Sequence, residues 1–386
     1  MLPSPEATAV VRRAVRAALA AEAGDSAASV DLGAARLEDV LAAVRRHRVT
    51  ALLAGQGLAI GLPPEVIQAL GDAREHARLG SLQQLRRLAE VARVLEGAGV
   101  LVLFVKGPCL AVQTTGDFTA RDSGDVDILV DPAAAAVTLT ALQDAGWEVR
   151  PGLPSDVRSW GWKYLQATYC EVTLDGPLGT VDLHWRLDPT RRGLPGFTEL
   201  WARRSTVTIA GRDFETLSPE DAFTHSCHHA AKDEWRTLRS LVDIHRMLRD
   251  HPTTEALCRR VPRHTIAVVE STVGLPAGVV RLPAGQRRSD HAARRRARVA
   301  QAGPLRPEPG LGRGAYRAAG YRLASGRGFE DAALTIAAAV LPSAAFTGIP
   351  SPVASRAVPE ALWRRLRYVI RCLGADGRLA ASRQYR

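Results

Sequence analysis

Residues 100–105 (VLVLFV) form an uninterrupted apolar run, and this run does most to restrict the fold. A short run without a polar position is typical of a strand buried on both faces. The chain before it differs, because apolar residues over 5–96 recur every three or four positions, as they do along one face of a helix. A sheet covered by helices is therefore expected.

The chain after this run alternates strand and helix patterns. Pro108 favours a helix start directly after the first strand, and Gly146 marks the end of a later helix. The expected elements are strands over 125–130, 165–174, 180–185, 205–209 and 214–217, and helices over 108–115, 132–146, from 218 onward and over 362–373. This order predicts an α+β fold, with a mixed sheet flanked by N-terminal and C-terminal helical regions.

Charge and cysteine content narrow the class of protein. The formal net charge of +11 favours polyanionic partners such as nucleotides, nucleic acid or acidic membranes. Residues 281–330 hold twelve arginines against three acidic residues, and their Gly and Pro content predicts a loosely structured basic segment. Five scattered cysteines without CxxC spacing fit neither a disulfide framework nor a zinc pattern, so a reduced, cytoplasmic location is expected. We find no signal-peptide pattern, and no apolar stretch long enough for stable membrane insertion.

The segment GDVDILV at 124–130 places two carboxylates on one strand. Side chains alternate across a strand, so Asp125 and Asp127 point to the same face, roughly 6–7 Å apart. Carboxylates at this spacing can share magnesium ions, which prefer hard oxygen ligands and are often held together with substrate phosphates. Taken alone, an Asp-x-Asp strand is also typical of an exposed strand end.

A second strand, GTVDLHW at 179–185, carries another carboxylate. Asp182 lies among apolar residues and needs a partner, which a metal shared with Asp125 and Asp127 would supply. The alternative is a carboxylate on a solvated strand face. His184 lies on the same face as Asp182, where it would contact a nucleotide, orient a carboxylate or pack as a hydrogen-bonded core histidine.

Lys106 and Gly107 lie between the first strand and the next helix. A helix N-terminus presents free N–H groups and the positive end of its dipole to a phosphate. Gly107 would permit close approach, and Lys106 adds a positive charge. A plain strand-to-helix turn with a solvated lysine is the alternative.

In combination these segments resemble a known family. Lys106-Gly107, followed by the segment Arg121-x-x-Gly-Asp-x-Asp and by VDLHW, resembles the uncharacterised nucleotidyltransferase family of the polymerase-β-like nucleotidyltransferase superfamily. The resemblance covers residues 80–250 best. It implies that Asp125 and Asp127 are the paired metal ligands. It also implies that Asp182 is a third catalytic and metal-binding carboxylate, which helps to deprotonate the acceptor hydroxyl.

The resemblance further implies nucleotide-binding residues. Lys106 and Gly107 occupy the place where the superfamily more often has Gly-Ser touching the triphosphate, and Arg121 matches an arginine that holds a phosphate or braces the Asp loop. His184 is expected at the nucleotide. The implied reaction uses two Mg²⁺ ions about 3.5–4 Å apart at the α-phosphate of an NTP, with basic side chains offsetting the remaining charge.

The implied function is Mg-dependent transfer of a nucleoside monophosphate from an NTP to an acceptor hydroxyl. The acceptor is open between a small molecule, a peptide natural product, a protein and an RNA end. Relatives of the family often lie near natural-product biosynthesis genes, which favours a small molecule or peptide over RNA. One alternative is a catalytically inactive protein of this fold that binds RNA or a protein partner through its basic segment. Another is a toxin-like enzyme that modifies tRNA ends.

Two further patterns have a purely structural interpretation as well as a functional one. His225, His228 and His229 with Cys227 suggest zinc, but no HExxH pattern or second ligand pair accompanies them, so a structural or substrate-side role is favoured. The arginine run at 294–298 is typical of a solvated segment as well as of a phosphate contact.

On these patterns we divide the chain into five parts: an N-terminal helical region (1–98), a nucleotidyltransferase core (99–217), a helical region packing on the core (218–280), the basic segment (281–330) and a C-terminal helical region (331–386).

Overall fold

A computed structural model gives the fold of the chain. The described residues are 3–25, 29–188, 194–250, 261–262, 264–279, 287–303 and 329–374. The chain divides into two compact units, each assembled from three stretches of sequence. Unit 1 comprises Met1–Arg86, Phe104–Gly124 and Arg203–Arg306, and unit 2 comprises Arg87–Leu103, Asp125–Ala202 and Pro307–Arg386. The five parts expected from the sequence remain a prediction.

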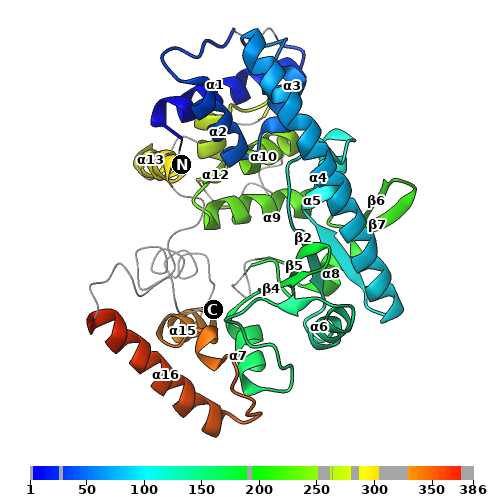
Figure 1. Cartoon of the computed structure of the whole chain (residues 1–386), viewed down its shortest axis with the longest axis vertical. Helices are drawn as coiled ribbons and strands as arrows, with labels where there is room; N and C mark the ends of the chain where they lie inside the picture. Colours follow the sequence, from blue (N-terminus) through cyan, green and yellow to red (C-terminus); the bar gives the residue numbers. More distant parts are fainter. Residues whose placement is uncertain are drawn as a thin grey trace. The chain divides into compact units, whose positions relative to one another are not determined.

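Unit 1 is mainly helical (Figure 1). Ser4 and Ser218 cap the N-termini of α1 and α9, because their hydroxyls accept hydrogen bonds from Ala7 N and Asp221 N. The elements are α1 (Pro5–Glu22), α2 (Leu37–His47), α3 (Thr50–Gln56), α5 (Gly107–Thr115), the hairpin β6 (Ser205–Ile209) and β7 (Arg212–Thr216), α9 (Pro219–Lys232), α10 (Leu238–Asp250), α12 (Thr265–Thr272) and α13 (Arg287–Ala302). The long helix α4 (Pro64–Gly97) starts in unit 1 and continues in unit 2.

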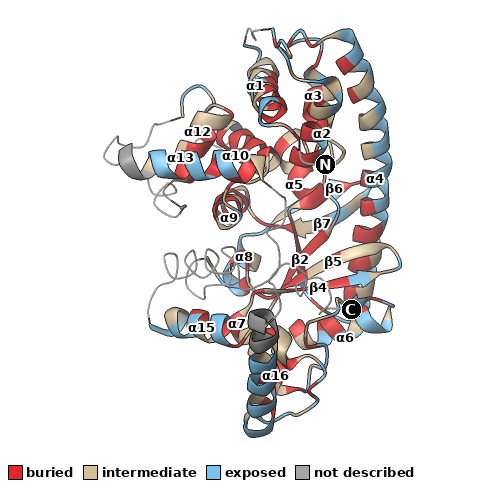
Figure 2. Ribbon diagram, turned by 60° about the vertical axis from the view of Figure 1, so that its left-hand side comes forward, coloured by how far each residue is buried: buried red, intermediate tan, exposed pale blue. Residues whose placement is uncertain are grey.

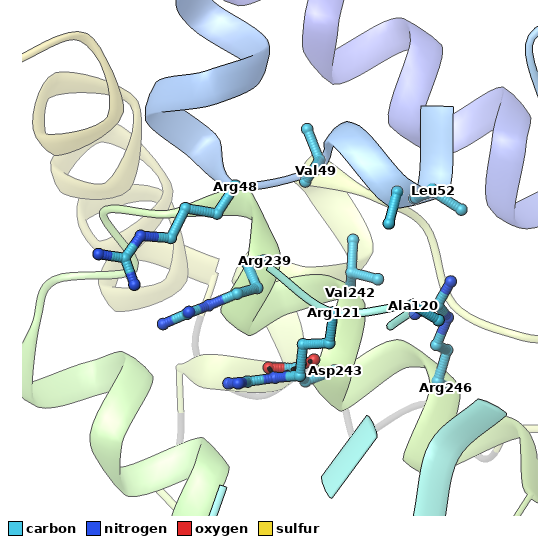
Figure 3. A pocket seen from close by; sticks show the side chains of 10 residues that line it. Arg48, Val49, Leu52, Ala120, Arg121, Arg239, Val242, Asp243 and Arg246 are labelled. Atoms are coloured by element: carbon cyan, nitrogen blue, oxygen red, sulfur yellow. Dashed lines mark hydrogen bonds and ion pairs between the residues drawn. The ribbon is translucent and has the colours of Figure 1, made fainter. Parts of the chain in front are cut away.

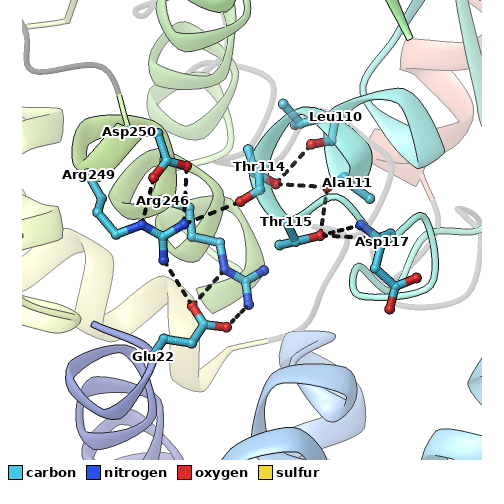
Figure 4. A network of polar contacts seen from close by, with 9 residues as sticks. All are labelled: Glu22, Leu110, Ala111, Thr114, Thr115, Asp117, Arg246, Arg249 and Asp250. Carbon is cyan, nitrogen blue, oxygen red and sulfur yellow. Dashed lines mark hydrogen bonds and ion pairs between the residues drawn. The ribbon is translucent and has the colours of Figure 1, made fainter. Parts of the chain in front are cut away.

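A polar network joins α1, α5 and α10 inside unit 1 (Figure 4). Glu22, at the end of α1, accepts hydrogen bonds from the guanidinium of Arg246 at 2.6 and 3.1 Å. Arg249 lies near the same carboxylate and also bonds Asp250 and the carbonyl of Thr114. Because the Arg246 side chain is almost fully buried, the pair satisfies charges that would be costly to bury alone.

Unit 2 is built on a five-stranded sheet in the order β1-β2-β5-β4-β3. β2 pairs with β5 in parallel, whereas β4 pairs antiparallel with both β5 and β3. The sheet is therefore mixed, which confirms the expected α+β fold. Its strands are β1 (Val102–Val105), β2 (Val126–Val130), β3 (Glu148–Val149), β4 (Glu171–Gly176) and β5 (Gly179–His184). The helices of unit 2 are α6 (Ala135–Asp144), α7 (Trp160–Thr168), α8 (Phe197–Ala202), α15 (Phe329–Val340), the 3-10 turn η1 (Ser343–Phe346) and α16 (Ala354–Gly374).

Alternation along the strands separates an apolar face of this sheet from a polar one. The register pairs Val126 with Val181 and Ile128 with Leu183, and all four side chains are buried. The intervening residues of β2, β4 and β5 lie on the other face and include the carboxylates of Asp127, Glu171, Asp175 and Asp182. The apolar face anchors the strands, so the polar face is free to carry chemistry.

The C-terminal elements form a second apolar cluster in unit 2. Phe346 packs against Trp160 and Tyr164 of α7, with ring centroids 5.2 and 4.8 Å apart. The Tyr164 hydroxyl donates to the carbonyl of Leu341 at 2.7 Å. Along α16, by contrast, most described positions are exposed (Figure 2).

Two expectations about local structure were wrong. Residues 165–168 belong to α7 rather than to a strand, because Ser159 caps a helix that buries Trp162 and Leu165 on one side. Residues 287–302 form α13 rather than a loose segment, since Ala293, Ala297 and Ala300 recur at helical spacing and are buried. The rest of the basic segment, 281–286 and 304–328, lies outside the described residues. No helix in the described part of the chain is long and apolar enough to span a membrane.

Candidate active site

The polar face of the sheet brings the predicted carboxylates together. Asp127 on β2 is the direct register partner of Asp182 on β5, and Thr173 on β4 is the partner of Asp182 on its other side. Directly paired residues of neighbouring strands share a face, so these three side chains form one row. Asp125 directly precedes β2 and, two residues before Asp127, falls on the same face.

This row places negative charges in a poorly solvated environment. Asp127 is 6% exposed, and within the described part of the chain Asp182 Oδ1 is buried without a hydrogen-bond partner. Burial, followed by the charge of Asp127, raises the pKa of Asp182 to about 6. Buried carboxylates side by side are unfavourable unless a cation offsets them. An unsatisfied carboxylate oxygen in such a row fits a divalent cation that prefers oxygen ligands, such as Mg²⁺.

His184 lies against the carboxylate row. Its Nε2 is 3.2 Å from Asp127 Oδ1, and its Nδ1 is 3.1 Å from Glu171 Oε2. The imidazole is almost fully buried and lies between these two carboxylates. Its role at a nucleotide or in orienting a carboxylate stays a prediction.

Arg150 adds a cation to the same region of unit 2. It forms a bidentate ion pair with Asp175, at 2.9 Å from Nε and 2.7 Å from Nη2. The hydrogen bond to Asp175 is the main cause that raises the pKa of Arg150, and the charges of Asp182 and Asp125 raise it further. The guanidinium is therefore within electrostatic range of the carboxylate row.

Arg87 holds the turn between β4 and β5. Its guanidinium donates to the carbonyls of Leu178 and Thr180, at 2.5 and 3.3 Å. Gly179 has φ +112°, a conformation that side chains rarely adopt, so the turn depends on a glycine, and a Cβ there would also meet this guanidinium. The charge of Asp125 acts on Arg87 and raises its pKa, although burial is the larger influence and lowers it.

The loop before Asp125 is braced within unit 1. Arg121 is buried, and its Nε donates to both carboxylate oxygens of Asp243 at 3.1 and 3.0 Å (Figure 3). Asp122 accepts a hydrogen bond from Thr50 N, and the Ser123 hydroxyl donates to the side chain of Gln84. Arg121 also lines a small pocket with other arginines, namely Arg48, Arg239 and Arg246.

Lys106 and Gly107 lie at the start of α5, as expected. Lys106 has φ 61° with ψ −146°, and Gly107 has φ 48°, so both residues have a positive φ at the junction of β1 and α5. A non-glycine residue with a positive φ is strained, and such strain often marks functional sites. Lys106, Gly107 and Arg121 belong to unit 1, whereas the carboxylates and His184 belong to unit 2. Their roles toward phosphate remain a prediction.

Sequence patterns did not single out Glu171, Arg150 or Arg87. Glu171 faces His184 only because β4 and β5 pair in one register, and the two arginines reach the region from distant elements. The histidines of α9 form no group of three potential metal ligands in the part of the chain that the structure describes.

Residues 34–267 match the model of a family described as uncharacterised nucleotidyltransferase. Neither a curated protein nor a solved structure matches the chain.

Proposed function

Because the chain belongs to the uncharacterised nucleotidyltransferase family and is thereby a transferase enzyme, we propose that it moves a nucleoside monophosphate from an NTP to an acceptor hydroxyl with the help of Mg²⁺. The observation that carries the proposal is the row of Asp125, Asp127 and Asp182 on one face of the sheet. Three carboxylates in this arrangement have no evident role in packing, but they suit a reaction at a phosphate.

In this proposal Asp125, Asp127 and Asp182 hold magnesium. When bound, Mg²⁺ supplies positive charge at the reacting phosphate and at the acceptor oxygen. The buried, unsatisfied Oδ1 of Asp182 and its raised pKa, about 6, support the assignment. His184 keeps the Asp127 carboxylate in a fixed orientation through the 3.2 Å contact of Nε2.

Asp182 has a second role toward the acceptor. Its carboxylate is the base that accepts the proton of the acceptor hydroxyl. Arg150 offsets negative charge near the row. Lys106 and Gly107 at the start of α5 are proposed as phosphate-binding residues. Arg121, buried against Asp243, braces the loop that leads into Asp125.

The acceptor is a small molecule or a peptide rather than RNA. The implied place of the protein is the cytoplasm, where NTPs are abundant. The described part of the basic segment is the helix α13, which buries alanines and so packs as an ordinary helix of unit 1. This favours a catalytic function over nucleic-acid binding through that segment.

The proposal is tested by calorimetric titration of each NTP in the presence and absence of Mg²⁺. Wild-type protein is expected to bind one NTP in a Mg²⁺-dependent manner, and the double variant Asp125→Ala/Asp127→Ala to bind none. Asp144→Ala, which removes an exposed carboxylate at the end of α6, is the matched control and should bind as wild type.

Two outcomes would contradict the proposal. If folded wild-type protein binds no NTP, the enzyme assignment fails. If it binds RNA instead, in a salt-sensitive manner that survives loss of all three aspartates, the protein is an inactive member of the family that works by binding.

A further inference from the structure

Directly beside the carboxylate row, β4 and β5 gather a thiol, a carboxylate and an imidazole. The potential ligand atoms of Cys170, Glu171 and His184 all lie within 4.8 Å of one another. Nucleotidyl transfer as proposed above uses only the Nε2 side of His184. The Nδ1 side, with Cys170 and Glu171, has no part in that chemistry.

The spacing of these atoms suits a tetrahedral metal ion. Bonds of about 2.0–2.1 Å to nitrogen and oxygen place the two ligand atoms roughly 3.3 Å apart. His184 Nδ1 and Glu171 Oε2 are 3.1 Å apart, so these two ligands already stand at coordination distance. A thiolate bond of about 2.3 Å requires the sulfur to lie roughly 3.6 Å from the other two atoms, and in the structure the three ligand atoms lie within 4.8 Å of one another.

The backbone holds the three residues in place. Glu171 and His184 are direct register partners in the antiparallel ladder. The carbonyl of Cys170 accepts a hydrogen bond from Trp185 N at 3.0 Å, which fixes Cys170 beside the end of β5. Cys170 and His184 are buried, while the Glu171 side chain is 38% exposed, so the site has one side through which an ion and a water ligand could enter.

Nε2, the second ring nitrogen of His184, has the kind of contact that a metal-binding histidine usually makes. Histidines that bind a metal through one nitrogen usually donate the other N–H to a carboxylate, which fixes the ring and its tautomer. With a cation on Nδ1, the proton of His184 lies on Nε2, 3.2 Å from Asp127 Oδ1. A metal ion at this site would therefore influence, through His184, the orientation of a carboxylate of the proposed active site.

We propose that Cys170, Glu171 and His184 form a transition-metal site, filled most readily by Zn²⁺. Thiolate and imidazole are soft or borderline ligands that favour Zn²⁺ over Mg²⁺, and three protein ligands leave a fourth position for water. Binding takes up one divalent ion and releases the thiol proton to solvent. The loaded site acts as a clamp that fixes the His184 ring and, through Nε2, the orientation of Asp127. The inference does not depend on the proposed function, since metal binding here is measurable without any nucleotide.

The test is a Co²⁺ titration of the full-length metal-free protein, followed by absorption spectroscopy and by metal analysis. Wild-type protein is expected to bind one thiolate-ligated Co²⁺ per chain and to develop the near-ultraviolet absorption of a cobalt–thiolate bond, which Zn²⁺ then abolishes by displacement. Cys170→Ser should lose this absorption. Cys109→Ser, a change at another buried cysteine, should retain it.

Two further variants keep the test decisive. Glu171→Gln keeps the thiol and should weaken Co²⁺ binding roughly tenfold or more, since even the loss of an outer partner costs about 10–100-fold. Asp125→Ala/Asp127→Ala should still develop the cobalt–thiolate absorption at saturating Co²⁺, but with weaker binding, because Asp127 is the outer partner of His184. The proposal is overturned if wild-type protein shows no such absorption, or if the absorption persists in Cys170→Ser.

Discussion

Asp182 is held in an environment that opposes its charge. Burial first, and the charge of Asp127 second, raise its pKa from 3.8 to about 6. Between these values the unfolded chain has lost the proton while the folded chain keeps it. The folded state thus binds more protons, and the free energy of unfolding falls as pH rises. Above about pH 6 the decrease in the free energy of unfolding is complete. It is on the order of 3 kcal/mol, because each unit of pKa difference corresponds to about 1.4 kcal/mol.

Asp182→Asn is therefore expected to stabilise the metal-free protein at neutral pH by up to about 3 kcal/mol while it abolishes nucleotidyl transfer. Asparagine keeps the size of the side chain but carries no charge. Urea unfolding with a chelator present measures the change, and the gain should shrink toward zero below about pH 4, where Asp182 of the wild-type protein is protonated in both the folded and the unfolded state.

Magnesium supplies the control for this experiment. It should stabilise wild-type protein and have a smaller effect on Asp182→Asn, because the variant has lost one ligand. A gain in stability that is equal at both pH values would show that the charge of Asp182 is not its cause.

The local sequence pattern was enough to predict the carboxylates of the site, but not the residues that contact them in the fold. The alternation rule placed Asp125 and Asp127 on one face from sequence alone. Glu171 was missed because the strand expected over 165–174 carried no information on pairing. A shift of one residue moves every side chain to the opposite face, so only the register of β4 against β5 could bring Glu171 to His184.

Among the elements, the β4–β5 hairpin depends on the backbone of Gly179. Its φ of +112° is a conformation that side chains rarely adopt, and a Cβ would meet the guanidinium of Arg87. Gly179→Ala is expected to lower the free energy of unfolding by about 1–3 kcal/mol. Since Arg87 can no longer hold the turn, NTP binding should weaken as well. Urea unfolding and calorimetry measure the two effects.

Gly80→Ala is the matched control in α4. Gly80 is exposed, and a Cβ there would meet nothing within 4 Å. Because alanine has the higher helix propensity, the variant should be more stable by about 0.5–1 kcal/mol. If Gly179→Ala were equally stabilising, the turn would not need a glycine.

The elements themselves were predicted well where local signals are strong. The Ser-Pro-Glu-Asp segment at the start of α9 carries a cap, a proline and acidic residues, and the helix begins there. The helix α7 was missed because its short apolar segment fits a strand pattern equally well. Its packing against Phe346, far along the chain, is an interaction that no local pattern reveals.

For the whole molecule, the family match ends at residue 267, yet unit 2 continues to the C-terminal helices. Phe346 is 1% exposed and packs against both Trp160 and Tyr164. Phe346→Ala is expected to destabilise the protein by about 3–5 kcal/mol, because it leaves a cavity in this cluster. Urea unfolding measures the loss.

Val340→Ala, at a side chain 60% exposed, serves for comparison and should change stability by less than about 0.5 kcal/mol. Equal effects of the two variants would mean that the C-terminal cluster contributes little to unit 2.

Each unit is assembled from three separate stretches of sequence, and this limits how such a gene can change. The polypeptide passes from one unit to the other five times, so no single cut releases either unit intact. Recombination between relatives could exchange residues 125–202 and carry over the polar sheet face as one block, but Lys106 and Arg121 would stay behind with the recipient. Acquiring a new acceptor specificity is therefore expected to proceed by point mutation and loop insertion rather than by shuffling of modules.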